Sequence, residues 1–196
     1  MTQLLSCECG ALQGLVEAPG TALRARCYCR DCRAFARFLG AAERVLDTQG
    51  GTNVLATVPR RVQFTRGVEH LRCMSLSDQG LLRWYSGCCR TPIGNTPRDP
   101  KVSYVGLIDT CLPGMPANRQ SVRVAVHTQS AHGRVEYSRL AMILGTLRIA
   151  GRVMAARLGG GYRQNPFFRP GSAEPLVAPQ VVSPEEREAL RAVQPS

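Results

Sequence analysis

Nine cysteines are the residues of this chain best suited to chemistry, and seven of them stand in three groups: Cys7-x-Cys9, Cys27-x-Cys29-x-x-Cys32 and Cys88-Cys89. Residues i and i+2 of a strand face the same side, so the first group can present two sulfurs to one ion. A CxxC segment closes a tight loop whose sulfurs converge on a metal. Three cysteines in six residues rarely pack as apolar side chains. The second group therefore predicts a metal site, with a redox pair at Cys29 and Cys32 as the alternative.

Zinc is the metal that such groups favour. It takes four protein ligands at a structural site, and three plus water or substrate at a catalytic one. Three thiolates leave a net charge of −1 on the bound ion and four leave −2, and arginines near the second group could compensate that charge: Arg24, Arg26, Arg30, Arg33 and Arg37. Ordinary surface charge is the competing interpretation of these arginines.

The other residues that could take part in chemistry give weaker indications of a functional site. Cys73 and Cys111 are isolated among strand residues, and we expect them to be buried as small hydrophobic side chains. The single histidines, His70, His127 and His132, are expected to be structural or solvated. Glu8, Tyr28 and Asp31 lie near the cysteines in sequence, but no convincing general base emerges among them.

Short alternating segments must position these cysteines. Two strands around a tight turn are expected in 3–18, several more in 54–85, and others in 102–109 and 121–128, where Val122, Val124 and Val126 share a face. Turn-forming clusters separate them at 50–53, 77–80, 94–100 and 113–118. A short helix is expected from Arg33 to Leu39. Many short strands without a βαβ rhythm indicate a mainly β fold of antiparallel strands.

The C-terminal part changes character and predicts a helix over 137–158. Six apolar residues form one stripe at helical spacing: Leu140, Ile143, Leu144, Leu147, Met154 and Leu158. We expect this stripe to pack on the β core. A helix lying on a membrane surface is the alternative, weakened because Met142, Ile149 and Val153 interrupt a clean polar face.

The tail after Gly159-Gly160-Gly161 is rich in proline, but Phe167-Phe168 and Val181-Val182 would suit a solvated linker poorly. We expect it to be extended and partly ordered. Ser183-Pro184 followed by two glutamates is typical of a helix start, and a short helix should run to about Val193. The expected organisation is a metal-binding domain over 1–133, with a helix and tail over 134–196 packed on it.

Composition excludes several classes. The chain has 196 residues, 44% hydrophobic and 20% charged, which is ordinary for one globular domain. No charge-free apolar window of 18 residues or more predicts a membrane span. The N-terminal segment does not resemble a secretory signal, and nine cysteines without one argue for thiolates in a reducing, cytoplasmic compartment rather than for disulfides. The net charge of +11 comes almost entirely from arginine. Because no basic stripe is interleaved with aromatic residues, nucleic-acid binding ranks last.

Taken together, the three cysteine groups resemble those of a known family. The segments that carry the resemblance are Cys7-Glu8-Cys9-Gly10, then Cys27-Tyr28-Cys29-Arg30-Asp31-Cys32-Arg33, then Trp84-Tyr85-Ser86-Gly87-Cys88-Cys89-Arg90-Thr91-Pro92-Ile93. Their order and spacing are similar to those of the glutathione-dependent formaldehyde-activating enzymes, a family that includes the centromere protein V domain. The resemblance covers about 3–128. The part beyond it looks like the extension of a bacterial branch of that family.

That resemblance implies a β-tent fold with two zinc sites. A structural site would use Cys7, Cys9 and Cys89, and a functional site with an open position would use Cys27, Cys29 and Cys32. Ser86 stands where the family has its fourth structural ligand. Cys88 could substitute by a local shift, although neighbours on a strand point in opposite directions; a site completed by water, or a weaker one, is the other outcome. Arg90 also replaces a family glycine. One or two Zn²⁺ per chain are therefore expected.

The family reaction joins the sulfur of glutathione to formaldehyde, or reverses that step. The resemblance thus implies a zinc protein acting on a glutathione or other thiol adduct, of carbon–sulfur lyase type if it is an enzyme, with the nearby arginines holding the carboxylates of glutathione. The alternative is a non-catalytic, zinc-stabilised binding or regulatory module.

Overall fold

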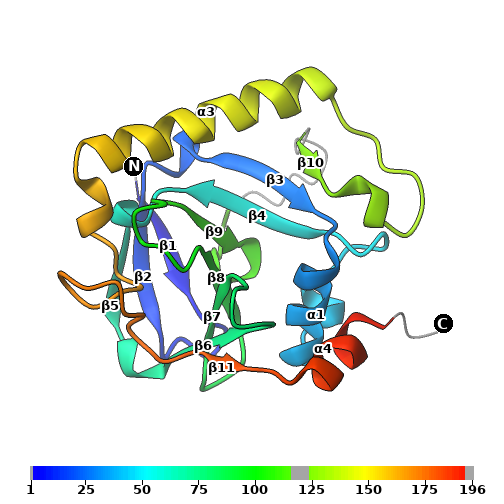
Figure 1. Cartoon of the computed structure of the whole chain (residues 1–196), viewed down its shortest axis with the longest axis horizontal. Helices are drawn as coiled ribbons and strands as arrows, with labels where there is room; N and C mark the ends of the chain where they lie inside the picture. The colour runs from blue at the N-terminus through cyan, green and yellow to red at the C-terminus, as the bar shows by residue number, and fades with distance from the viewer. Residues whose placement is uncertain (1, 116–123, 193–196) are drawn as a thin grey trace.

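Two sheets form the body of the protein, and the computed structural model describes residues 2–115 and 124–192 of it (Figure 1). The small sheet has the order β1-β2-β5, and the large one has the order β10-β3-β4-β9-β8-β7-β6-β11. The strands are β1 (Thr2–Ser6), β2 (Gln13–Glu17), β3 (Leu23–Cys27), β4 (Thr52–Thr57), β5 (Val62–Arg66), β6 (Leu71–Ser75), β7 (Leu82–Ser86), β8 (Pro92–Thr96), β9 (Val105–Ile108), β10 (Ala125–Val126) and β11 (Gln180–Val181). Among the strands of the described residues, only the two outermost of the large sheet, β10 and β11, pair in parallel with their neighbours.

Four α-helices accompany the sheets in the described part of the chain: α1 (Arg30–Phe38), α2 (Ala42–Val45), α3 (Arg139–Leu158) and α4 (Pro184–Arg191). The predominance of antiparallel strands and the long C-terminal helix are as the sequence predicts. The whole is a mixed α/β structure. The strand expected over 121–128 is only Ala125–Val126 within the described residues, and Val122 and the expected helix end at Val193 lie outside them.

Helix α1 begins earlier than the sequence predicts, at Arg30 rather than Arg33. The reason is a cap: Cys29 is the extended residue before the helix, and its sulfur accepts a hydrogen bond from the backbone N–H of Cys32 at 3.3 Å. A side chain that satisfies a free N–H of the first turn fixes the start of a helix. Cysteine is not a usual capping residue, so capping preferences alone miss it.

The core between the sheets is centred on Trp84, which is fully buried and donates its indole N–H to the Thr96 hydroxyl at 2.9 Å. The C-terminal tail supplies part of this core. Phe167 is also fully buried, with its ring 5.2 Å from Trp84 and 5.4 Å from Phe64, measured between centroids. The tail is therefore ordered over this stretch, as expected, because its aromatic side chains fill the core.

After Phe167 the tail crosses to the far edge of the large sheet. There β11 pairs with β6, and α4 then packs beside α1 (Figure 1). Ser183 caps α4 by accepting a hydrogen bond from the Glu186 N–H at 3.1 Å, as the sequence predicts. An ion pair of 2.6 Å joins Arg191 of α4 to Asp31 of α1. The two ends of this contact are 160 residues apart in the chain.

Helix α3 packs on the sheet through the face opposite to the one expected. Gly145 and Ala156 are its buried residues, and Met142, Ile149 and Val153 are partly buried beside them. The expected stripe is exposed instead. The physical reason is close approach: a Cβ placed on Gly145 would lie 2.8 Å from a methyl carbon of Leu23 in β3. Small residues let the helix lie this near, and the large side chains consequently point away from the body.

None of the described helices has the length and apolar character that crossing a bilayer requires.

Candidate metal centres

Four cysteine sulfurs meet where two turns of different sheets approach each other. Cys7 and Cys9 lie in the turn between β1 and β2, and Cys88 and Cys89 lie in the turn between β7 and β8. Their sulfur atoms all lie within 4.8 Å of one another. Cys7 is 3.6 Å from Cys9, Cys9 is 3.3 Å from Cys88, and Cys88 is 3.9 Å from Cys89. Sulfurs at the corners of a tetrahedral zinc site are about 3.8 Å apart, given a Zn–S bond of about 2.3 Å. The donor set and its spacing thus fit zinc.

Cys88 joins this cluster because it is not on a strand. β7 ends at Ser86, and the chain then turns, with the Arg90 N–H bonding to the Ser86 carbonyl at 2.9 Å. Arg90 adopts a left-handed conformation, with φ of 56°. In a turn of this kind two consecutive sulfurs can point the same way, so the objection from strand geometry does not apply to Cys88 and Cys89.

Ser86 is completely buried, and its hydroxyl lies beside a cysteine of the cluster and is not one of the four sulfur ligands. Its hydroxyl lies 3.2 Å from the sulfur of Cys89 and accepts a hydrogen bond from the Thr91 N–H at 3.1 Å. The Thr91 hydroxyl is also 3.1 Å from the Cys89 sulfur, and it accepts from the Glu8 N–H of the facing turn at 3.0 Å. Burial raises the pKa of the Cys89 thiol, but the hydrogen bonds from Ser86 and Thr91 outweigh it and lower that pKa to about 5. Thr91, which the sequence did not single out, links the two turns.

The second cluster lies where β3 runs into α1. Cys27 ends the strand, Cys29 caps the helix and Cys32 is in its first turn, so a single short connection brings the three sulfurs within 4.8 Å of one another. Hydrogen bonds from the Cys27 and Cys32 thiols lower the pKa of Cys29 to about 2. Hydrogen bonds to Cys29 and Cys32, together with burial, raise the pKa of Cys27. Without a metal the cluster therefore holds its negative charge on Cys29.

Arg83 is a buried cation close enough to the cluster to offset part of this charge, although it also lies 3.9 Å from Asp31, and the sequence gives no warning of it. It lies on β7, is 2% exposed, and its guanidinium stands 5.5 Å from the ring centroid of Phe35 in α1. It donates to the Asn95 side chain at 3.0 Å, and its positive charge contributes to lowering the pKa of Cys29. The alternation of Leu82 and Trp84 with Arg83 predicts an arginine in solvent. Helix α1 covers that second face of the sheet.

Tyr104 is a second neighbour that the sequence missed. Burial, followed by the negative charges of Cys32 and Cys27, raises the pKa of its hydroxyl to about 12. The tyrosine therefore stays protonated at neutral pH and is close enough to the cluster to respond to its charge. Its position just before β9 carries no recognisable sequence motif.

Most of the arginines near the second cluster are engaged elsewhere. Arg26 forms an ion pair of 3.3 Å with Asp47. Arg33 is buried and donates to the backbone carbonyls of Tyr28 and Ser130, whereas Arg37 donates to the carbonyls of Leu190 and Ala192 near the end of α4. These contacts hold elements together. Arg30 is exposed.

The acids and bases near the cysteines are similarly occupied. Glu8 pairs with Arg44 at 3.2 Å, and the Tyr28 hydroxyl donates to Asp47 at 3.3 Å. Asp31 is paired with Arg191. Cys73 and Cys111 are buried in the main core, as predicted, and burial raises the pKa of Cys73 to about 12.

These features place the chain in a class: mixed α/β proteins dominated by antiparallel sheets, with two cysteine clusters able to hold metal ions. Within that class its family can be stated. Residues 2–143 match the profile of DUF6151, a family of unknown function, and the chain belongs to that family.

Among solved structures, the chain is similar to a protein of Rhodobacter sphaeroides known from a crystal structure. The two are 20% identical, with a TM-score of 0.42 over 64% of this chain and 98% of the other. No curated protein matches the chain.

Proposed function

We propose that this is a zinc protein with two sites of different roles. Cys7, Cys9, Cys88 and Cys89 supply a complete set of four ligands, which is the arrangement of structural zinc. Cys27, Cys29 and Cys32 supply three, which leaves a position for an exchangeable ligand. The resemblance of both groups to those of the glutathione-dependent formaldehyde-activating enzymes supports this division.

The observation that carries the proposal is the difference in ligand number. Among the described residues, the second cluster brings together three side chains able to bind a metal, and the first brings together four. A thiol-containing substrate is the natural occupant of the open position, because soft thiolate ligands suit such a metal. We therefore propose carbon–sulfur bond formation or cleavage on a small thiol adduct, with glutathione and formaldehyde as the reference pair.

The residues around the second cluster suit that chemistry. Zinc bound there would hold a substrate sulfur as its thiolate. In the forward direction the thiol gives up its proton, and its sulfur bonds to the carbonyl carbon while the C=O double bond becomes a single bond. The oxygen takes up one proton, equal in number to the one that the thiol released, and the reverse step returns thiol and aldehyde. We propose that the hydroxyl of Tyr104, whose pKa responds to the charge of the cluster, donates a hydrogen bond to that oxygen, and that buried Arg83 offsets part of the negative charge.

The test combines metal content with turnover. The full chain, purified without chelators, should carry about two zinc ions, and Cys29→Ser should remove one. Exchange between free and thiol-bound formaldehyde, followed by NMR, should then be faster with the protein than in buffer and should fall to the buffer rate in Cys29→Ser. Unaccelerated exchange in a protein holding both ions would rule out this activity.

A non-catalytic, zinc-stabilised module is the second candidate. It is favoured by one observation: Arg26, Arg33 and Arg37 form structural contacts and are not free to hold the carboxylates of glutathione. In that case the second cluster would serve stability alone. Cys29→Ser would then lower the free energy of unfolding as much as Cys9→Ser, whereas the enzyme proposal expects a clearly smaller loss for Cys29→Ser.

A further inference from the structure

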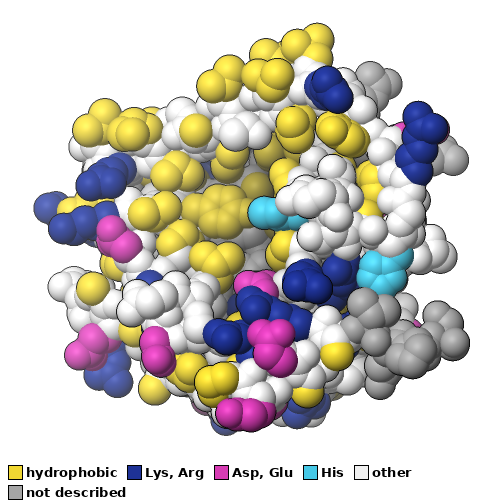
Figure 2. Space-filling model, turned by 45° about the vertical axis from the view of Figure 1, so that its right-hand side comes forward, with side chains coloured by type: hydrophobic (Ala, Val, Ile, Leu, Met, Phe, Trp, Pro, Cys, Tyr) yellow, Lys and Arg dark blue, Asp and Glu magenta, His cyan; other side chains and the backbone are white. Residues whose placement is uncertain are grey.

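The outer face of α3 is an apolar surface without a partner in the described structure (Figure 2). The exposed fraction of its large side chains runs from 52% for Ile143 to 81% for Leu158. We call this set the α3 outer face: Leu140, Ile143, Leu144, Leu147, Met154 and Leu158. It follows the whole helix, which is about 30 Å long. Monomeric proteins seldom expose so many large apolar side chains side by side, so this surface indicates a binding site for a partner.

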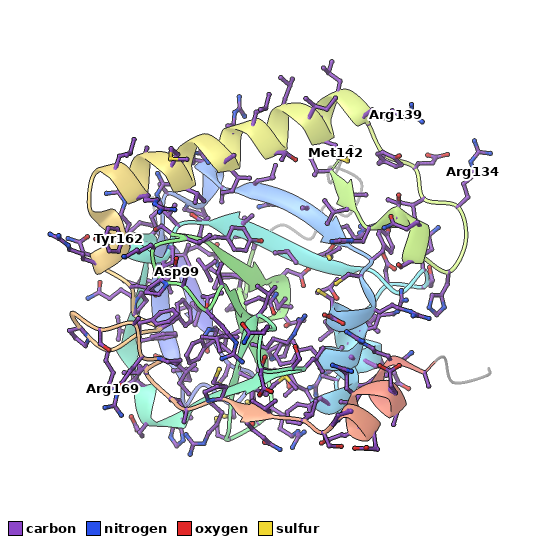
Figure 3. All side chains as sticks on the ribbon, viewed as in Figure 1. Asp99, Arg134, Arg139, Met142, Tyr162 and Arg169 are labelled. Carbon is purple, nitrogen blue, oxygen red and sulfur yellow. The ribbon has the colours of Figure 1, made fainter. Side chains whose placement is uncertain are left out.

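Arginines border the α3 outer face on both sides. At about 100° per residue, Arg139 and Arg157 fall on one side of the stripe and Arg148 on the other. Figure 3 shows Arg139 at the N-terminal end of the helix and Met142 beneath it, toward β10. Helix α3 contains no aspartate or glutamate. Within the described part of the chain, none of these three arginines forms an ion pair. Their charge is thus available to an external anion.

A pocket beside the C-terminal half of α3 adds an independent feature. Its volume is about 190 Å³, and Arg60, Arg61 and Arg152 line it together with small residues of the helix end. Arg61 and Arg152 both donate to Thr21. Burial, and then the charges of Arg152 and Arg60, lower the pKa of Arg61, so three cations are close together. Arg152 follows Arg148 by one turn, which puts the pocket on the same border of the α3 outer face.

We propose that α3 lies flat on a lipid bilayer containing anionic phospholipids. The α3 outer face would enter the boundary between headgroups and acyl chains, Arg139, Arg148 and Arg157 would pair with lipid phosphates on either side, and the pocket of Arg60, Arg61 and Arg152 would hold one further phosphate. Such a helix rests on the membrane and does not span it. Met142, Ile149 and Val153, which in the sequence weakened this interpretation, face the protein and leave the outer face unaffected.

Charge favours a bilayer over a second copy of the chain. In a symmetric dimer through α3, the arginines bordering one outer face would meet those of the other, and α3 has no acidic residue to pair with them. An anionic bilayer has apolar acyl chains that can contact the α3 outer face and phosphates above them that can contact the arginines at its borders.

Vesicle flotation of the full zinc-loaded chain tests the proposal. The chain should float with vesicles of equal parts phosphatidylglycerol and phosphatidylcholine, bind phosphatidylcholine alone at least tenfold more weakly, and lose affinity as salt rises. Leu144→Glu with Leu147→Glu should reduce binding at least tenfold. The matched control is Val68→Glu with Leu81→Glu, two side chains each 43% exposed on other surfaces, with the same change in charge. Zinc content and thermal unfolding verify that both variants are folded.

The arginines are tested separately. Arg60→Gln with Arg148→Gln should weaken binding to the anionic vesicles severalfold more than Arg30→Gln with Arg66→Gln, which removes the same charge elsewhere. If the two arginine pairs lose the same affinity for the vesicles, or if the two glutamate pairs do, then only the net charge of +11 attracts the vesicles. Either result would overturn the proposal. Absence of vesicle binding would also overturn the proposal. That holds if sedimentation shows a dimer that Leu144→Glu with Leu147→Glu dissociates, and equally if an acidic protein is found to bind this face. None of these outcomes depends on turnover at the metal sites.

Discussion

At the scale of single residues, Cys88 and Ser86 show how one turn changes the interpretation of a motif. Ser86 stands where the resemblance in the sequence implies a fourth ligand, yet its hydroxyl contacts the Cys89 sulfur from outside the four-sulfur group. Cys88 reaches the other sulfurs because the chain leaves β7 after Ser86. The first cluster is therefore better equipped than the serine substitution suggests.

A pair of variants separates these two residues. Cys88→Ser should lower the zinc content of the full chain by about one ion, because it removes one of four thiolates. Ser86→Ala should keep both ions and lower the affinity of one by about tenfold or more, as loss of a group that orients a ligand does. Elemental analysis and chelator competition measure the two quantities. Loss of the ion in Ser86→Ala with retention in Cys88→Ser would reverse the assignment.

Arg83 gives a second prediction at this scale. Its charge contributes to lowering the pKa of Cys29, so Arg83→Met should raise that pKa and weaken zinc binding at the second cluster by about tenfold. Zinc affinity measured by competition with a coloured chelator checks this. Arg30→Met, an exposed arginine near the same cluster, serves as the control and should change the affinity little.

At the scale of elements, the β3–α1 connection sets the protonation of the second cluster. A hydrogen bond with Cys27 lowers the pKa of Cys32. The hydrogen bond between Cys32 and Cys29, together with the burial of Cys32, outweighs that effect and raises the pKa of Cys32 to about 11. The pKa of Cys27 is raised as well, whereas that of Cys29 is lowered to about 2. At neutral pH the metal-free cluster thus carries two protons that zinc must displace.

A pH dependence follows from this count. Because bound zinc displaces about two protons, its apparent affinity for the second cluster should fall about 100-fold for each pH unit below neutrality. Chelator competition at pH 6 and pH 7, performed on the full chain, measures the slope. An affinity that does not change between these values would contradict the protonation described here.

The tail provides the other prediction at the element scale. Phe167→Ala empties a completely buried site beside Trp84 and should cost about 3–5 kcal/mol of unfolding free energy. Val181→Ala, in the same tail but 41% exposed, should cost far less. Chemical denaturation under saturating zinc gives both values. Equal effects would mean that the tail does not stabilise the core.

At the scale of the whole molecule, the two clusters join very different lengths of chain. The first ties together cysteines that are 81 residues apart, and the second spans one connection of six residues. Closing a long loop constrains the unfolded chain more. Metal at the first cluster should therefore matter more for stability.

Metal removal tests this difference. A strong chelator should lower the midpoint of thermal unfolding of the wild type substantially. The same chelator should lower it far less in Cys9→Ser, whose first cluster is already broken, than in Cys29→Ser, whose first cluster is intact. Calorimetry of the three proteins with and without chelator gives the six midpoints, and equal shifts in the two variants would show that both clusters stabilise the fold alike.

The sequence by itself determined what depends on local spacing. The CxCxxC group, the predominance of short antiparallel strands, the Ser183 cap and the buried Cys73 and Cys111 all follow from neighbours within a few residues, where chain geometry restricts the outcomes. The long helix, predicted over 137–158 and observed over 139–158, likewise follows from its periodicity.

Only the tertiary structure decided what depends on contacts between distant segments. It brought Cys88 to Cys7, covered Arg83 with α1, engaged Arg26, Arg33 and Arg37 near the second cluster in structural contacts, and placed Phe167 in the core. It also turned the apolar stripe of α3 outward. Periodicity shows that a helix has two faces, but which face meets the sheet depended on Gly145 fitting against Leu23, and that closeness exists only once the chain is folded.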